Sequence, residues 1–189
     1  MFRELTKTVQ IFWTNFMIIY REAKPEEFEK VAILHANSWK TFYRNIFSDT
    51  YLDHEVLADR LAVWNKRSQI NDINRSVQLA LENEEIIGFV CTYLDHSLEH
   101  GSLLDNLHVL GKHQGKGIGL TLIQKAFDWV KENRPLQNMY LTVLTENHKS
   151  KAFYYRFNGN FKQNFEEKTP YGDLVSVERI SWNQRPKPI

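Results

Sequence analysis

The sequence contains a single cysteine, Cys91, which excludes an internal disulfide and any site built on a Cys-x-x-Cys pair. A chain without disulfides fits a reducing compartment, so we expect a cytoplasmic protein. Cys91 lies inside an apolar stretch at residues 86–93. A cysteine in such a stretch behaves as a small hydrophobic residue, so we expect it in the core rather than as a nucleophile.

Neither sign of charge is in excess, because 24 Lys and Arg residues stand against 23 Asp and Glu residues. Nucleic-acid-binding domains usually carry a clear basic excess, so no nucleic-acid partner is expected. The sequence also lacks an unbroken apolar run long enough for an integral membrane span, and it lacks the Gly-x-Ser-x-Gly sequence of serine hydrolases. What it has is an ordinary hydrophobic content of 42% in 189 residues, enough to bury the core of one domain.

Residues 1–16 are a segment whose role the sequence leaves open. Hydrophobic side chains recur there at helical spacing, namely Phe2, Leu5, Val9, Phe12, Trp13 and Phe16. The segment is an amphipathic helix docked on the domain or on a second subunit of a homodimer, a membrane-surface helix, or a translated leader; we favour docking. One domain is then expected over residues 17–182, followed by a C-terminal tail at residues 183–189.

The rest of the chain alternates between strand-like and helix-like periodicity. In chain order, the expected strands and helices cover residues 17–22, 25–43, 51–64, 77–81, 86–93, 103–109, 118–134, 139–144, 148–157, 161–166 and 174–182. This order, β-α-α-β-β-β-α-β-α-β-β, predicts an α/β protein whose hairpins make the sheet mixed. The strand–helix–strand unit at residues 103–144 should be parallel, with a right-handed crossover.

A glycine-rich turn follows the expected strand at residues 103–109 and opens a helix. Backbone N–H groups at such a helix start form a cradle for phosphate. The glycine spacing fits neither the P-loop nor the G-x-G-x-x-G dinucleotide fingerprint. What remains is Gln-x-x-Gly-x-Gly at residues 114–119, for which a plain turn that uses glycine for positive φ is the alternative interpretation.

This segment resembles the pyrophosphate loop of the GNAT superfamily of acyl-CoA-dependent N-acyltransferases. The stretch Asn147-x-x-Ser150-x-x-Phe153-Tyr154, with Gly159 and Phe161 after it, is similar to the stretch that follows the fifth strand of that family. Residues 35–53, which include His35, Ser38 and Trp39, resemble the helix pair of one GNAT subgroup. The resemblance covers residues 17–182.

Two departures from the family pattern stand out. Gly111 occupies a position where proline is usual. Leu103 occupies a position near the start of the fourth strand where many relatives carry a glutamate. The second departure leaves the identity of the general base open.

The resemblance implies a GNAT-like fold in which the parallel strands beside the glycine-rich turn splay apart around acetyl-CoA, which serves as the acyl donor without a metal. The pantetheine arm would pair with the strand, and the diphosphate would bind amides of the turn. The residues implied in binding the cosubstrate are Leu107, His108, Val109, Gln114, Gly115, Lys116, Gly117, Ile118, Gly119 and Asn147. Within this set the amide of Val109 would polarise the thioester carbonyl, and Asn147 would touch the pantetheine arm or cap the helix at residue 148.

The resemblance also implies a catalytic acid, because the family counterpart of Tyr154 protonates the departing thiolate of coenzyme A. The alternative is that Tyr154 packs beneath the sheet beside Phe153 and Phe157. For the base, Asp105 is the candidate, on the strand face of residue 107 by alternation. His108 points the opposite way and titrates in a useful range, so it is the other candidate.

Trp39 and Tyr43 are expected to line the pocket for the acceptor. The function we expect is transfer of the acetyl group to a primary amine of a small molecule or peptide, by direct attack in a ternary complex. A non-catalytic acyl-CoA-binding or sensing module with the same fold is the alternative, and a protein whose first helix serves assembly is a third interpretation. His96 and His100 have metal-like spacing but lie around a turn, so we interpret them as solvated hairpin residues.

Overall fold

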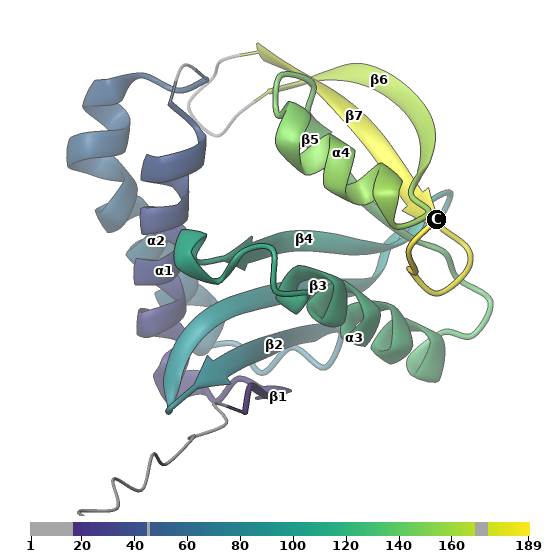
Figure 1. Cartoon of the computed structure of the whole chain (residues 1–189), viewed down its shortest axis with the longest axis horizontal. Coiled ribbons are helices and arrows are strands. Elements are labelled where there is room, and N and C mark those ends of the chain that lie inside the picture. Colours follow the sequence, from purple (N-terminus) through teal and green to yellow (C-terminus); the bar gives the residue numbers. More distant parts are fainter. Residues whose placement is uncertain (1–16, 45, 169–173) are drawn as a thin grey trace, which may run out of the picture.

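The computed structural model describes residues 17–44, 46–168 and 174–189, so residues 1–16 and the expected turn at 170–173 lie outside the described residues. The chain forms a seven-stranded sheet in the order β1-β2-β3-β4-β5-β7-β6, with helices against both faces (Figure 1). In chain order the elements are β1 (Ile19–Glu22), α1 (Phe28–Phe42), α2 (Val56–Ser68), β2 (Arg75–Glu82), β3 (Glu85–Ser97), β4 (Gly101–Val109), α3 (Ile118–Asn133), β5 (Met139–Leu144), α4 (His148–Arg156), β6 (Asn160–Lys168) and β7 (Leu174–Trp182).

The predicted element order and the mixed sheet are confirmed. Short helical turns at Pro25–Glu27, Tyr51–Glu55 and Gly111–His113 precede α1, α2 and the glycine-rich turn. The β2–β3 hairpin turns through residues 83 and 84, both at positive φ, as in the tight turns that match the strand twist. The strand predicted to end near residue 93 instead continues to Ser97, because its pairing with β4 extends as far as Ser97 and Gly101.

Two hydrophobic clusters lie on opposite faces of the sheet. Alternation along β3 sends Val90 toward α3 and sends Phe89 and Cys91 toward α1 and α2. Cys91 is fully buried, as predicted for a core residue. In the part of the chain that the structure describes, no helix is long and apolar enough to cross a membrane.

The strands β4 and β5 are parallel but stay paired over a short length only. Their register joins Ser102 to Met139 and Leu103 to Tyr140, and the two strands diverge beyond these pairs (Figure 1). A register shift in the β3–β4 ladder lies next to this point, where Cys91 faces Asn106 but the next residue of β3 faces Leu104. The splay that the family resemblance implied is therefore present, with a bulge at residue 105 beside it.

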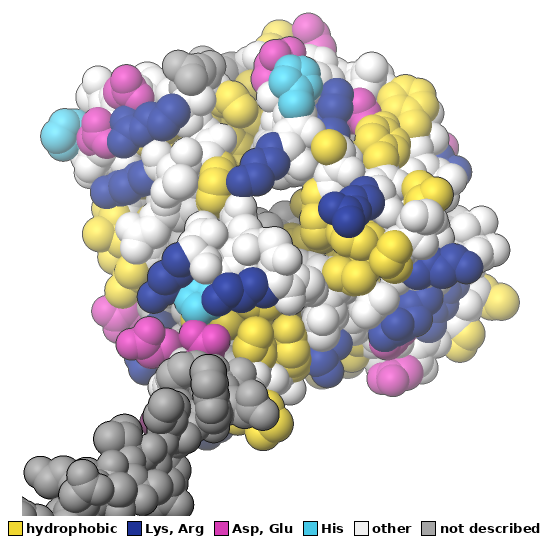
Figure 2. All heavy atoms as spheres, in the orientation of Figure 1, with side chains coloured by type: hydrophobic (Ala, Val, Ile, Leu, Met, Phe, Trp, Pro, Cys, Tyr) yellow, Lys and Arg dark blue, Asp and Glu magenta, His cyan; other side chains and the backbone are white. Residues whose placement is uncertain are grey.

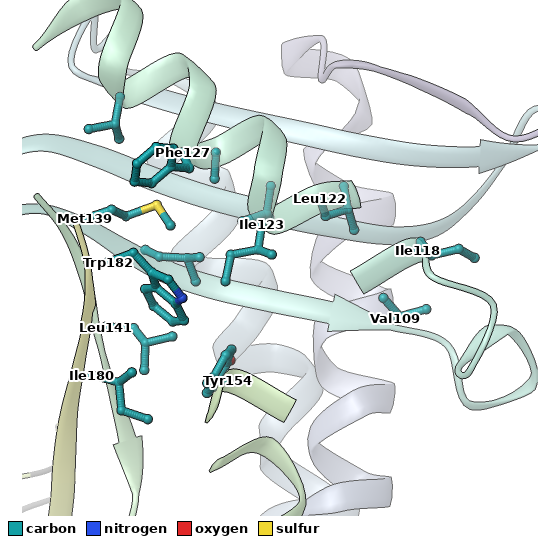
Figure 3. Close-up of a cluster of buried hydrophobic side chains, with 14 of the residues drawn as sticks. Val109, Ile118, Leu122, Ile123, Phe127, Met139, Leu141, Tyr154, Ile180 and Trp182 are labelled. Carbon is teal, nitrogen blue, oxygen red and sulfur yellow. The ribbon is translucent and has the colours of Figure 1, made fainter. Parts of the chain in front are cut away.

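Trp182, at the end of β7, connects α4 to the sheet on the β5 side of the opening. Its ring is fully buried in the cluster that contains Met139, Leu141 and Ile180, and its centre lies 5.8 Å from that of the Tyr154 ring on α4 (Figure 3). Its indole Nε1 donates a hydrogen bond of 2.8 Å to the carbonyl oxygen of Phe157, just after α4. This bond joins the end of α4 to the last strand of the sheet.

We expect Trp182→Phe to lower the free energy of unfolding by about 1–3 kcal/mol, because it removes a buried donor and leaves the Phe157 carbonyl without its partner. Urea titration followed by circular dichroism measures the change. Trp129→Phe is the matched control, since Trp129 is only partly buried on α3, and it should cost clearly less. Equal losses in the two variants would contradict the role given to the Trp182 bond.

Candidate active site

A cleft of about 970 Å³ opens where β4 and β5 diverge. Figure 2 shows a hollow on this face, with hydrophobic side chains along its wall and Lys and Arg side chains near its rim. The cleft is lined by most of the site residues that the sequence predicted, namely Trp39, Tyr43, Asp105, Leu107, His108, Val109, Gln114, Gly115, Gly117, Ile118, Gly119, Asn147 and Tyr154. Lys116 is exposed and is not part of this lining.

The glycine-rich turn brings the start of α3 to the cleft. Gly115 and Gly117 have φ values of 78° and 81°, in the left-handed region that glycine tolerates best. Gly117 is the residue just before α3, and a Cβ there would meet nothing within 4 Å. The requirement for glycine is thus set by backbone conformation, and the turn leaves open space over the first amides of α3, which have no partner inside the helix.

The side chain of Gln114 ties this turn to the end of β4. Its Nε2 donates to the carbonyl oxygen of Val109 at 3.0 Å, and its Oε1 accepts from Lys149 of α4 at 2.8 Å. Lys149 also lies 5.0 Å from the ring centre of Phe42, so its chain crosses the cleft between α4 and α1. Sequence reasoning missed Lys149, although a lysine in the first turn of the helix after the Asn147 cap was the available signal.

The amide of Val109 faces the space between the diverging strands. The next residue, Leu110, donates its N–H to the carbonyl oxygen of Ile87 on β3 at 2.9 Å. Successive peptide groups of a strand point to opposite sides, so the N–H of Val109 points away from β3, toward β5. Beyond the last β4–β5 pair this direction leads into the cleft.

Asn147 caps the start of α4, and Tyr154 lies about two turns further along the helix. The Oδ1 of Asn147 accepts the backbone N–H of Ser150 at 3.1 Å, so the predicted capping role is confirmed. Burial raises the pKa of Tyr43, in the turn after α1, and the side chain of Asn147 partly offsets this rise, so the two residues lie close together. Asn147 thus links the two helices on either side of the cleft.

Tyr154 both packs in the core and lines the cleft. Its ring lies 5.4 Å from that of Phe153 and 5.8 Å from that of Trp182, and 8% of its surface is exposed. Burial raises the pKa of its hydroxyl well above the ordinary value of 10.0, and the neighbouring Tyr43 raises it further. Tyr154 therefore keeps its proton at neutral pH, whereas Tyr155 points its hydroxyl at Glu178 instead.

Aromatic rings form the other end of the cleft. The rings of Trp39 and Phe47 are stacked, with centres 5.2 Å apart and planes 9° apart, and Tyr43 lies 5.1 Å from Trp39. The guanidinium of Arg60, from α2, lies 4.6 Å above the Trp39 ring. Phe47 and Arg60 also line the cleft. Arg60 was not predicted from the sequence; its signal was its place on the second helix of the pair after β1.

Asp105 does not lie on the face that strict alternation predicted. Its Oδ2 accepts from Arg67 of α2 at 2.8 Å, and the same guanidinium reaches the Oδ1 of Asn106 at 3.1 Å. Asp105 therefore faces the α1–α2 layer, as His108 does, and the prediction that the two point in opposite directions was wrong. The bulge at residue 105 is the cause, since it interrupts the alternation of side chains.

His108 was also predicted to titrate in a useful range, and this was wrong. The dense protein around its imidazole lowers its pKa to about 3, and the positive charge of Arg60 adds to the effect. Its Nδ1 lies 2.8 Å from the hydroxyl of Ser38 on α1. The ring therefore stays neutral through the physiological range.

His35, whose ring centre is 4.5 Å from that of His108, is neutral for the same reason. Burial lowers its pKa well below 6.5, and the positive charge of Arg60 lowers it further. Its Nδ1 accepts a hydrogen bond of 3.1 Å from Trp64, so the proton of the neutral ring is on Nε2. Protonation of Nδ1 would break this bond.

The two histidines around the β3–β4 turn do not form a metal site. The Nδ1 of His96 lies 2.6 Å from the Tyr140 hydroxyl, and the Nε2 of His100 lies 2.7 Å from Arg179. These contacts correct the view of both rings as simply solvated. Over the described ranges, no three His, Cys, Asp or Glu side chains are arranged to hold a metal ion.

A mixed sheet that splays beside a glycine-rich helix start is the arrangement that the resemblance to the GNAT superfamily implied. The model of the acetyltransferase (GNAT) family matches residues 33–159, which is most of the described domain. The chain therefore belongs to the acetyltransferase (GNAT) family.

Individual relatives are similar over most of their length. The probable N-acetyltransferase Rv2775 of Mycobacterium tuberculosis is 28% identical over 137 residues, which are 71% of this chain and 75% of that protein. The uncharacterized N-acetyltransferase YuaI of Bacillus subtilis is 26% identical over 134 residues, 69% of this chain and 74% of that protein. The PaiA N-acetyltransferase of Thermoplasma acidophilum, solved in complex with coenzyme A, is 26% identical with a TM-score of 0.64, over 85% of this chain and 98% of that one.

The neutral histidines predict a pH dependence of stability. Below pH 6.5 and down to about 3, the unfolded chain binds a proton at residue 108 that the folded protein does not. The free energy of unfolding therefore falls as pH decreases through this window. Since the His108 ring lines the cleft, we expect it to contribute about 1 kcal/mol to the loss of unfolding free energy between pH 6.5 and pH 5. This is less than the value for a fully buried ring.

Urea unfolding at a series of pH values measures this slope in the wild type and in His108→Gln. The variant should show a shallower loss of stability on acidification. His148→Gln is the control, because the His148 side chain is 77% exposed, and it should keep the wild-type slope. A His108→Gln slope equal to that of the wild type would refute the assignment.

Proposed function

We propose that the protein transfers the acetyl group of acetyl-CoA to a primary amine, by direct attack within a ternary complex. The observation that carries the proposal is the opening between β4 and β5, which exposes main-chain donors beside a glycine-rich helix start and a protonated tyrosine. Family membership makes the chain an acetyltransferase with a coenzyme A-based cosubstrate, and a relative of the same fold binds coenzyme A. The acceptor and the residue roles below are part of the proposal.

The diphosphate would bind at the start of α3. The free amides of Ile118, Gly119 and the residues before them converge there, and the positive end of the helix dipole favours an anion. Lys116, exposed on the same turn, would add charge at longer range. Because main-chain groups do most of the binding, side-chain changes on this turn should act through backbone shape.

The pantetheine arm would continue along the unpaired edge of β4, at Leu107 to Val109. The N–H of Val109 then donates to the thioester carbonyl, and it stabilises the negative charge that develops on that oxygen when the amine attacks. Asn147, on the opposite side of the cleft, would hold the arm in place.

Tyr154 would act as the general acid. The amine nitrogen forms a bond to the carbonyl carbon, the carbon–sulfur bond breaks, and the thiolate takes the proton of the Tyr154 hydroxyl. The proton that the attacking nitrogen loses as the amide forms then restores the Tyr154 hydroxyl, directly or through water. The raised pKa of Tyr154 ensures that this proton is present at neutral pH. A thiol is a fair leaving group, so the contribution is expected to be about 10²–10⁴-fold.

Asp105 would receive the proton of the incoming ammonium, directly or through water. Its carboxylate lines the cleft, and the ion pair with Arg67 keeps it in place. His108 also lines the cleft, but a pKa of about 3 makes its neutral ring a weak acceptor. Asp105 is therefore the proposed base.

We expect Gly117→Val to weaken acetyl-CoA binding by about 10-fold or more, because valine disfavours positive φ and its side chain would fill the open space at the start of α3. Isothermal titration calorimetry measures the affinity. Gly111→Val is the control, since Gly111 also has open space around it but does not have positive φ. Equal affinities for the two variants would argue against a main-chain cradle at Gly117.

Tyr154→Phe should keep acetyl-CoA affinity and lose about 10²–10⁴-fold in the rate of thiol release with an accepted amine. Free-thiol detection across an amine panel gives the rate, and calorimetry gives the affinity. Tyr155→Phe, which changes the neighbouring ring whose hydroxyl contacts Glu178, should remain close to wild type. Tight acetyl-CoA binding with no thiol release for any amine, and no effect of Tyr154→Phe, would instead indicate a sensing module.

A further inference from the structure

We propose that the amine acceptor also carries a carboxylate, bound by Arg60, and an apolar or aromatic body that packs on Trp39 and Phe47. This inference rests on the proposed function and specifies its substrate class as amino acids with a large hydrophobic side chain. It comes from the charges and rings at the α1–α2 end of the cleft.

Arg60 is a nearly buried cation on the wall of the cleft. Only 11% of its side chain is exposed, and its Cζ lies 4.6 Å from the centre of the Trp39 ring. Its Nη2 donates to Asp59 at 2.7 Å, whereas its buried Nε has no hydrogen-bond partner among the described residues. A buried donor without a partner is costly, so this guanidinium has hydrogen-bonding capacity left for a ligand.

The carboxylate of Asp59, which pairs with Arg60, also accepts a hydrogen bond from a second side chain. Asp59 also accepts the hydroxyl of Tyr51 at 2.6 Å, and Asp59 is not part of the cleft lining, whereas Arg60 is. The cleft wall at this point therefore presents the cation and keeps its counter-ion behind it. A guanidinium in such a site is well suited to bind a carboxylate through two parallel hydrogen bonds.

A polyamine acceptor would carry a second ammonium group, and few carboxylates of the described residues line this end of the cleft to bind it. Among the described residues that line the cleft, the carboxylates are Asp105, which Arg67 already engages at 2.8 Å, and Glu167, an exposed residue of β6. The rings of His35 and His108 nearby are neutral, and both feel the field of Arg60. The electrostatics at this end thus favour an anionic group over a polyamine.

The rings supply the apolar half of the recognition. Trp39 and Phe47 are half-buried and stacked on each other, with ring centres 5.2 Å apart, so together they form an aromatic wall of the cleft next to Arg60. Tyr43 joins this wall to Asn147 and so to the proposed pantetheine site. An acceptor held by its carboxylate at Arg60 and by its side chain on this wall would extend its amine toward Asp105.

The test compares acceptors that differ only in the carboxylate. Phenylalanine, phenylalaninamide and phenethylamine form one series, leucine with its amide and its decarboxylated amine forms a second, and spermidine represents the polyamines. Thiol release gives kcat/KM for each, and calorimetry with acetyl-CoA is run on the same samples. The amine of an amino-acid amide loses its proton more easily than that of the acid, so a preference for the acid cannot come from basicity.

We expect the acids to exceed their matched amides and amines by about 10-fold or more in kcat/KM. Arg60→Gln should bring the acid-to-amide ratio close to 1, and Arg60→Lys, which keeps the charge, should restore part of it. Arg67→Gln is the matched control, because Arg67 lies on the same helix and stacks 4.7 Å over Trp64, but its donors are already used by Asp105 and Asn106. Its acid-to-amide ratio should stay that of the wild type.

The wild-type series alone can overturn the inference, even if a variant fails to fold. Turnover of amides or spermidine as fast as the acids would refute it, and so would turnover of none of the acids by protein that binds acetyl-CoA. An acid-to-amide ratio unchanged in folded Arg60→Gln would refute the role of Arg60. Loss of acetyl-CoA binding by the wild-type protein would instead refute the proposed function itself.

Discussion

The constraint on which the rest of the structure depends is the early separation of β4 from β5. The two strands share the pairs Ser102–Met139 and Leu103–Tyr140 and then part, which leaves the peptide groups of β4 beyond residue 103 without partners on β5; the side chain of Gln114 reaches only the carbonyl oxygen of Val109 among them. Unpaired backbone groups in a protein interior are costly and need a partner. The cleft is therefore a place where the sheet is unfinished, and a ligand that supplies peptide-like hydrogen bonds completes it.

One end of the cleft is formed mainly by main-chain groups and the other by side chains, and the two ends pack on different hydrophobic clusters. The end proposed to bind the coenzyme consists of main-chain groups of β4, the glycine-rich turn and α3, backed by the cluster that contains Leu122 and Ile123. The end proposed to bind the acceptor consists of side chains from α1 and α2, such as Trp39 and Arg60, outside that cluster. Side chains at the second end could therefore change while the main-chain groups at the first stay as they are.

Much of this could be predicted from the sequence, because the signals were local. Helical and strand periodicity gave the element order, and the glycine spacing at residues 114–119 pointed to a helix start with open backbone. The errors came from tertiary effects. Alternation could not anticipate the bulge that turns Asp105 toward Arg67, and a lone histidine in a strand does not reveal the surroundings that lower the pKa of His108 to about 3. The place of Arg60 on the cleft wall depends on how the helix pair packs on the sheet, so it could not be predicted from the sequence.

Gly119, the second residue of α3, faces Phe153 of α4 across the mouth of the cleft. A Cβ at Gly119 would lie 3.2 Å from that ring, closer than most side-chain contacts allow. The two helices can approach each other this closely at the entrance because the side chain of Gly119 is only a hydrogen atom. A larger residue at this position would push α3 and α4 apart at the entrance of the cleft and leave the deeper parts of the cleft unchanged. The width of the entrance therefore depends on one small residue.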